Sequence, residues 1–98
     1  EAAYMLIVDS YDKGDFSDVE TKVYAFSDSG SGQTYWLAKS FIVLGDSFAE
    51  RGELTQAKAT FESVRDGYSP SGADDDVQDN VRVRLEKLEV MISEKNNQ

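Results

Sequence analysis

Apolar residues recur every three or four positions in five stretches of this chain, and breaks rich in glycine, serine and aspartate separate them. Such spacing is that of one face of an α-helix. The pattern predicts an all-α fold of five helices. Two helical hairpins span residues 1–29 and 34–68, and a last helix spans residues 74–94.

The clearest pattern lies between Trp36 and Tyr68. One helical face carries Phe41, Leu44, Gly45 and Phe48; Gly52 then interrupts the spacing, and the face resumes with Ala57, Phe61 and Val64. Gly45 and Ala57 are small, as a close crossing of two helices requires, while aromatic rings fill the space beside it. Gly52 is suited to the positive φ that ends a helix.

The first hairpin is a degenerate version of the second. Its first helix carries Tyr4, Ile7, Val8 and Tyr11 and stops at Lys13-Gly14-Asp15, and Ser17 with Glu20 has the form of a capping box for the next helix, which carries Val19, Val23 and Phe26. Aligning Gly14 with Gly52 puts Val19, Val23 and Phe26 opposite Ala57, Phe61 and Val64. Tyr11 is one residue nearer its glycine than Phe48 is, which predicts that the first helix ends slightly early.

The remaining segments predict two connections and a terminal helix. Residues 30–33 form a Gly/Ser linker, and residues 69–73 form a loop in which Pro70 forbids continuation of the preceding helix. The last helix has one apolar stripe, which consists of Val77, Val81, Leu85, Leu88 and Ile92. A single stripe on a polar helix is typical of the cap that closes a helical array.

Composition narrows the choice of function. The net charge of −9 repels nucleic acid and anionic membrane surfaces, so neither is expected as a direct partner. The chain has no histidine and no cysteine, which removes the usual general base and the commonest zinc ligands. We expect no catalytic residues, no cofactor and no enzymatic activity. Because no capping residue precedes the first helix, we interpret the chain as a segment cut from a longer protein.

Two motifs have simpler explanations than ligand binding. The acidic run Asp74-Asp75-Asp76, with Asp79, lacks the spacing of a calcium loop, and acidic side chains in a first helical turn complement the helix dipole. We therefore expect a helix start and no metal site. Gly30-Ser31-Gly32 lacks the third glycine of a dinucleotide-binding fingerprint, so it is a linker.

The central hairpin resembles the tetratricopeptide repeat (TPR). Phe41, Leu44, Gly45 and Phe48, followed by Ala57 and Phe61, match its aromatic-x₂-Leu-Gly-x₂-aromatic and Ala-x₃-Phe signature. Gly14 and Gly52 are 38 residues apart, against a repeat period of about 34. Tyr35-Trp36-Leu37-Ala38 and the segment from Ala57 to Val64, followed by Tyr68, are similar to TPR domains of bacterial envelope proteins, such as the Tol-Pal-associated cell-division coordinator, outer-membrane-assembly lipoproteins and large Bacteroidetes repeat proteins.

This resemblance implies a TPR-like α-α superhelix, and a protein-interaction scaffold of the periplasm or outer membrane that binds a partner through its concave groove. By resemblance the groove positions fall on Met5, Asp9, Lys39, Ile42, Asp46, Ala49 and Glu50. This mixed apolar and acidic set suits a partner peptide with basic and apolar residues. For Trp36 we favour packing on the first hairpin over a role as a binding residue.

A second hypothesis gives the chain a structural role. It would then be the C-terminal cap of a longer repeat array, and it would mediate solubility or self-association. Association through the N-terminal end, residues 1–5, is expected in either case, because no preceding repeat covers Ala2, Ala3 and Met5.

Overall fold

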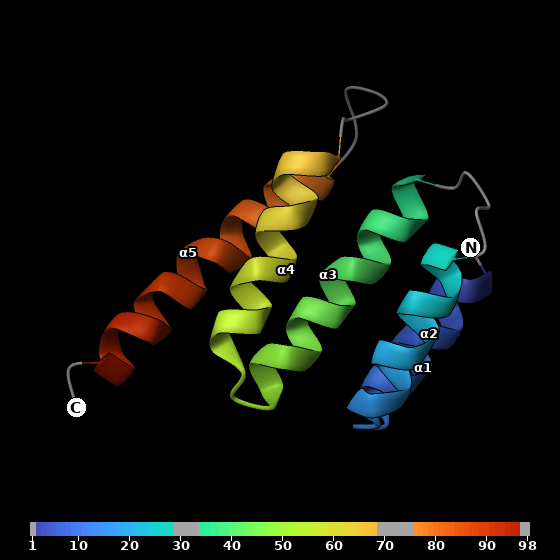
Figure 1. The fold of residues 1–98 in the computed structure, drawn as a ribbon, viewed down its shortest axis with the longest axis horizontal. Helices are drawn as coiled ribbons and strands as arrows, with labels where there is room; N and C mark the ends of the chain where they lie inside the picture. Colours follow the sequence, from blue (N-terminus) through green and yellow to red (C-terminus); the bar gives the residue numbers. More distant parts are fainter. Residues whose placement is uncertain (1, 29–33, 69–75, 97–98) are drawn as a thin grey trace.

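The computed structural model describes residues 2–28, 34–68 and 76–96. These residues form five α-helices and no strand, which confirms the all-α prediction: α1 (Ala2–Asp12), α2 (Phe16–Asp28), α3 (Thr34–Glu50), α4 (Leu54–Gly67) and α5 (Val77–Asn96). The Gly/Ser linker over 30–33 and the loop over 69–73 lie outside the described residues. Figure 1 shows the helices arranged from α1 and α2 at one end to α5 at the other.

The helices pack in two layers. Each helix contacts the next one in the chain, and α3 also contacts α1 and α5. Within the described residues, α2 and α4 do not touch each other. Helices α1, α3 and α5 therefore form one layer, and α2 and α4 form the other. The molecule is flat, with extents of 44 × 31 × 19 Å.

One hydrophobic core runs through all five helices. Its buried apolar residues include those that the spacing predicts for the second helix of each hairpin: Val19, Val23 and Phe26 in α2, and Ala57, Phe61 and Val64 in α4. Four of the five predicted stripe residues of α5 are also buried, namely Val77, Val81, Leu85 and Leu88. Helical periodicity thus identifies the inward faces correctly.

The two hairpin turns have the same backbone structure, 38 residues apart. In the first turn Gly14 has φ +78° and the amide of Asp15 donates to the carbonyl of Ser10 at 3.0 Å. In the second, Gly52 has φ +78° and the amide of Glu53 donates to the carbonyl of Phe48 at 2.8 Å. Both glycines therefore occupy the left-handed region that favours glycine. The alignment of Gly14 with Gly52 is a structural correspondence as well as a sequence one.

This correspondence corrects two predictions for the first hairpin. The first helix does not end early, because Asp12 and Glu50 end α1 and α3 at equivalent positions. The N-cap of α2 is Asp15 and not Ser17, which lies inside the helix: the carboxylate of Asp15 accepts a hydrogen bond from the amide of Asp18 at 3.2 Å. An Asp side chain caps a helix as well as Ser does, so the Ser-x-x-Glu pattern was misleading here.

The start of the last helix also differs from the prediction. Helix α5 begins at Val77, and the carbonyl of Asp76 accepts its first helical hydrogen bond from the amide of Asn80 at 3.0 Å. Asp74 and Asp75 lie outside the described residues. The side chain of Asp76 is engaged by α3, as described below.

Helices α3 and α4 cross closely at Gly45. A Cβ atom added to Gly45 would lie within 3.0 Å of three ring atoms of Phe61, so the ring occupies the space that a side chain would need. The equivalent positions in the first hairpin are Ile7 and Val23, both fully buried. The second hairpin pairs Gly45, which has no side chain, with the large ring of Phe61. The first hairpin has two side chains of intermediate size, Ile7 and Val23, at the same positions.

We predict that Gly45→Ala destabilises the fold by about 1–3 kcal/mol, and Gly45→Leu by more, because either side chain over-packs the crossing. Gly67→Ala is the control, since nothing lies within 4 Å of a Cβ added there. It should be neutral or slightly stabilising, through the higher helix propensity of alanine. Urea denaturation measures both, and equal midpoints for Gly45→Leu and Gly67→Ala would contradict the close crossing. Gly14→Ala is a poorer control because φ there is positive.

Candidate binding face

The exposed side of the α1, α3 and α5 layer, here called the binding face, contains most of the residues that the sequence places in a groove. Tyr35 and Lys39, one helical turn apart on α3, both reach Asp76 at the start of α5. The Tyr35 hydroxyl donates to the Asp76 carboxylate at 3.1 Å, and the Lys39 Nζ lies 3.4 Å from its other oxygen. Asp76 therefore ties the start of α5 to α3.

A second link joins the same helices two turns further on. The Arg84 Nε of α5 donates to the Asp46 carboxylate of α3 at 2.9 Å, and the Arg84 Nη1 donates to the side chain of Asn80 at 3.1 Å. Both members of the ion pair are about 30% exposed. Partial burial and a short distance make this a stronger restraint than a fully exposed pair.

Negative charges of α1 and α3 act on Tyr11 of α1. Burial and then the negative charges of Asp46 and Glu50 raise the pKa of the Tyr11 hydroxyl, although Arg84 acts in the opposite direction. Within the described residues, Glu50 and Asp12 form no ion pair, so their charges are not neutralised by a neighbouring side chain. This part of the binding face is negative.

Aromatic rings pack at the other end of the face. Trp36 of α3 lies against Tyr4 of α1, with ring centroids 5.3 Å apart, and against Tyr35, with centroids 5.1 Å apart. This agrees with the expectation that Trp36 packs on the first hairpin. Lys39 Nζ lies 5.6 Å from the centroid of the Tyr35 ring, which adds a cation–π contact to its ion pair.

The seven sequence-predicted groove residues divide into three groups. Met5, Asp9 and Glu50 are exposed, and Ala49 is half-buried. Lys39 and Asp46 face α5 and are held by Asp76 and Arg84. Ile42 does not fit the prediction, because it is 4% exposed and belongs to the core. The resemblance places it on the groove side of α3, where Lys39 and Asp46 reach α5, and we infer that the packing of α5 on α3 is the reason for its burial.

Sequence reasoning missed Tyr11 and Arg84 as members of the face, and it took Asp76 only as a helix start. The signal for α5 was present: Asp76, Asn80 and Arg84 recur every four residues, which places them on one face of a helix. Their partners on α3 could not be found from the sequence, because the loop before α5 leaves the register of the two helices open.

The described residues contain neither a cluster of metal ligands nor a membrane-spanning helix. In the described ranges, no three acidic side chains gather closely enough to ligate a metal ion. None of the helices described has the length and apolar character that a membrane crossing requires.

Comparisons with family models, with curated proteins and with solved structures gave no match to this chain.

We predict that the link through Asp76 fails in acid. The hydrogen bond from Tyr35 and the charge of Lys39 lower the pKa of Asp76 from its ordinary value of 3.8. A carboxyl group whose pKa is lower in the folded state than in the unfolded state stabilises the fold at pH values above its ordinary pKa. This contribution is lost as the pH falls through the pKa of the folded state. Asp76→Asn should therefore cost less than about 1 kcal/mol at neutral pH and nothing at low pH.

Thermal melts of wild type and Asp76→Asn between pH 2 and pH 7 measure this difference. The gap between the two melting temperatures should be constant at neutral pH and should close below about pH 3.8. Glu94→Gln, at an exposed position on the last turns of α5, is the control and should show a small gap throughout. A constant gap for Asp76→Asn would mean that the carboxylate charge is not what holds α5.

Proposed function

We propose that this chain is a protein-interaction scaffold of the tetratricopeptide type, which binds a partner protein or peptide on its binding face. Two features support the assignment to a repeat: the hairpin turns match at an offset of 38 residues, and alternate helices lie side by side in one layer. The TPR-like signature in α3 and α4 supports the type.

The observation that carries the proposal is the group of carboxylates around Tyr11. Glu50 and Asp12 are exposed and form no ion pair in the described part of the chain, and Asp46 is shared between Arg84 and the surroundings of Tyr11. Tyrosine and methionine are adaptable contact residues in interfaces, and Met5 is 65% exposed on the same helix as Tyr11. This chemistry suits a partner with basic and apolar side chains.

The similarity of the central hairpin to TPR domains of the bacterial envelope extends the proposal. It supports a proposed location in the periplasm or at the outer membrane, and a role in envelope assembly with no catalysis of its own. Under this proposal any catalytic activity belongs to the partner protein.

We predict that peptides selected from a displayed random library against this chain carry Lys or Arg next to apolar residues. Glu50→Lys should weaken a selected peptide about tenfold, which equals roughly 1.4 kcal/mol, because it places like charge opposite the ligand. Glu94→Lys is the matched control at an exposed site on α5, and it should leave the affinity nearly unchanged. Titration calorimetry measures the affinities, and amide shifts of labelled protein locate the peptide.

Two outcomes would count against the proposal. Selection of acidic peptides would contradict the partner chemistry, and equal loss of affinity in Glu50→Lys and Glu94→Lys would show that only the net charge matters.

A second candidate function, self-association, has an observation of its own. Among the described residues, six large apolar side chains are exposed, and five of them belong to the two end helices: Met5 and Leu6 on α1, and Val83, Val90 and Met91 on α5. The outer face of α5 is thus less polar than a terminal cap requires. Contact of one copy's α1 with the next copy's α5 would cover both ends.

We predict concentration-dependent association that grows with salt, since salt screens the repulsion between copies of charge −9 but leaves the apolar term intact. Leu6→Glu and Val90→Glu should each reduce it, whereas Ala59→Glu, at an exposed position on α4, should matter far less. Sedimentation at low and high ionic strength measures it. A strict monomer at high concentration in both conditions would reject end-to-end association. The residues that the sequence implicates, Glu1 with the side chains of Ala2 and Ala3, lie outside the described part.

A further inference from the structure

A pocket of about 240 Å³ opens between α3 and α4, on the other side of α3 from the binding face. Leu37, Ala38 and Phe41 of α3 form one wall, and the other comes from the end of α4: Ser63, Val64, Gly67 and Tyr68. At about 100° per residue, Leu37 lies roughly 200° around the helix from Tyr35 of the binding face. The two sites therefore do not share a surface.

Gly67 adds no side chain to the lining of the pocket. Gly67 lies in the last turn of α4, and nothing is found within 4 Å of a Cβ added there. Glycine is a poor helix residue, and no positive φ requires it at this position. A side chain added at this position would start in open space at the pocket lining.

The size of the pocket suits one large side chain. An apolar cavity of about 150 Å³ is sufficient for benzene, and pockets for small-molecule ligands usually start at about 300 Å³. A volume of 240 Å³ lies between these limits. The lining offers two hydroxyl groups, of Ser63 and Tyr68, and is otherwise apolar, which does not suit a polar metabolite.

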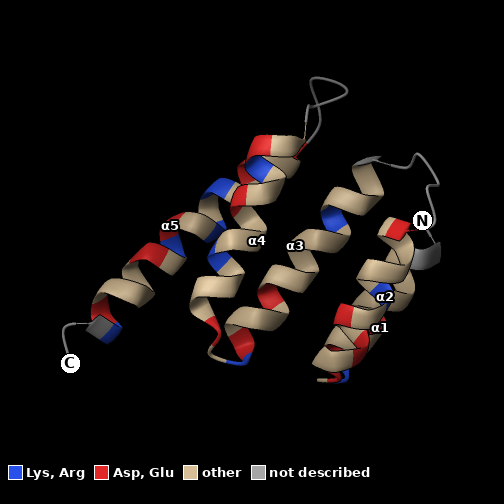
Figure 2. Ribbon diagram, in the orientation of Figure 1, with Lys and Arg blue, Asp and Glu red and all other residues tan. Residues whose placement is uncertain are grey.

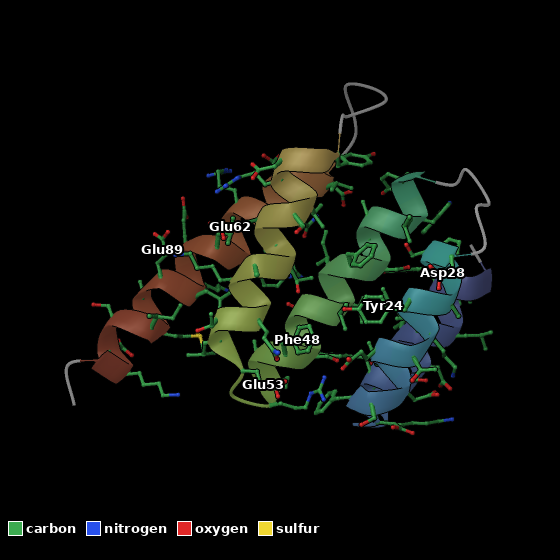
Figure 3. The ribbon with its side chains drawn as sticks, viewed as in Figure 1. Tyr24, Asp28, Phe48, Glu53, Glu62 and Glu89 are labelled. Atoms are coloured by element: carbon green, nitrogen blue, oxygen red, sulfur yellow. The ribbon has the colours of Figure 1, made fainter. Side chains whose placement is uncertain are left out.

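Aromatic surface continues outward from the pocket towards α2. The Tyr24 ring meets the Phe41 ring edge to face, with centroids 6.5 Å apart, and Tyr24 is 47% exposed. Figure 3 shows Tyr24 extending from α2 towards α3, with Asp28 one turn further along α2. A ligand in the pocket would thus have Tyr24 as its neighbour at the surface.

The charges around the pocket are negative. Asp28 is exposed and forms no ion pair with any described residue. Arg65 of α4 lies in the groove between α4 and α5, away from the pocket, and it is held by Asp66 at 2.9 Å and by Glu62 at 3.9 Å. Figure 2 shows acidic residues on every helix. A second copy of this chain, with charge −9, is therefore a poor occupant, and a basic segment is a good one.

We propose that this pocket receives one aromatic side chain of a basic segment of a partner protein. The ring fills the space beside Gly67 between Phe41 and Val64, and a flanking cation lies near Asp28. The chain then has two binding surfaces, one on each layer, and the second does not depend on the function proposed for the first.

The test uses a short synthetic peptide with one tryptophan between pairs of lysines. Two matched peptides replace the tryptophan by alanine or the lysines by glutamates. Calorimetry gives the affinity, and amide shifts of labelled protein report the site. We expect the shifts at Leu37, Phe41, Val64 and Gly67, and at least a tenfold loss of affinity with either matched peptide.

Gly67→Leu fills the pocket and should abolish binding. Ser63→Leu is a second filling variant, which keeps the test decisive if the first one folds poorly. Ala59→Leu makes the same kind of change at an exposed position two turns earlier on α4, and Glu50→Lys alters the binding face. Ala59→Leu should bind as wild type does. Glu50→Lys should leave the peptide-induced shifts at Leu37, Phe41, Val64 and Gly67 unchanged, even where it weakens binding of the same basic peptide at the binding face. Failure of the first proposed site would leave these results unchanged.

Four results would overturn the proposal. The first is equal affinity of the peptide for wild type and for a folded filling variant, and the second is a set of shifts that map to Tyr11 and Glu50 instead of the pocket.

The third is binding of free indole as tight as that of the peptide, which would make the occupant a small apolar molecule. The fourth is self-association of the chain alone that the filling variants abolish, which would make the occupant a second copy.

Discussion

The close contact of Gly45 with Phe61 is the constraint on which the rest of the structure depends. Because Gly45 has no side chain, the ring of Phe61 reaches the backbone of α3, and the two helices cross at short distance. Helix α3 is central: it packs against all four other helices. Its crossing with α4 therefore sets where α5 lies, and through α5 it sets which α3 side chains can reach Asp76 and Arg84.

The layering that follows gives α3 two exposed sides with different chemistry. On one side its tyrosine, lysine and aspartate side chains are used to hold α5 by hydrogen bonds and ion pairs. On the other side Leu37 and Phe41 line the pocket together with Gly67. A surface residue on the first side is thus also a structural residue. Substitutions of Asp46 or Lys39 would change both binding and the position of α5, which makes Glu50 the cleaner probe.

Helical periodicity was sufficient to predict the five helices and the inward residues of α2, α4 and α5, because burial of one face is a local property of the sequence. The glycine pattern also predicted the turns, since a positive φ at Gly14 and Gly52 has few alternatives. The cap of α2 was assigned to the wrong residue because Asp15 and Ser17 are both good N-caps.

The candidate site was predicted less well, for a physical reason. Ile42 looked accessible on the helix alone, but it is buried in the fold, on the side of α3 from which Lys39 and Asp46 reach α5. Lys39 and Asp46 pair with residues that are 37 and 38 positions later in the chain. The sequence does not predict how α5 is aligned along α3, so it does not predict these pairs. The pocket is lined by residues of α3 and of the end of α4, including Gly67, and a pattern of apolar residues does not reveal where two helices leave a space between them.

Exchange of the crossing residues between the hairpins tests the central claim most directly. Gly45→Ile and Phe61→Val place the first hairpin's pair, Ile7 and Val23, in the second. Each single variant should be destabilised, by over-packing or by a cavity. If the two hairpins are versions of one packing unit, the double variant should be more stable than the sum of the single effects predicts, by at least about 1 kcal/mol. Strict additivity in urea denaturation would show that the two positions do not share a space, and would contradict the account.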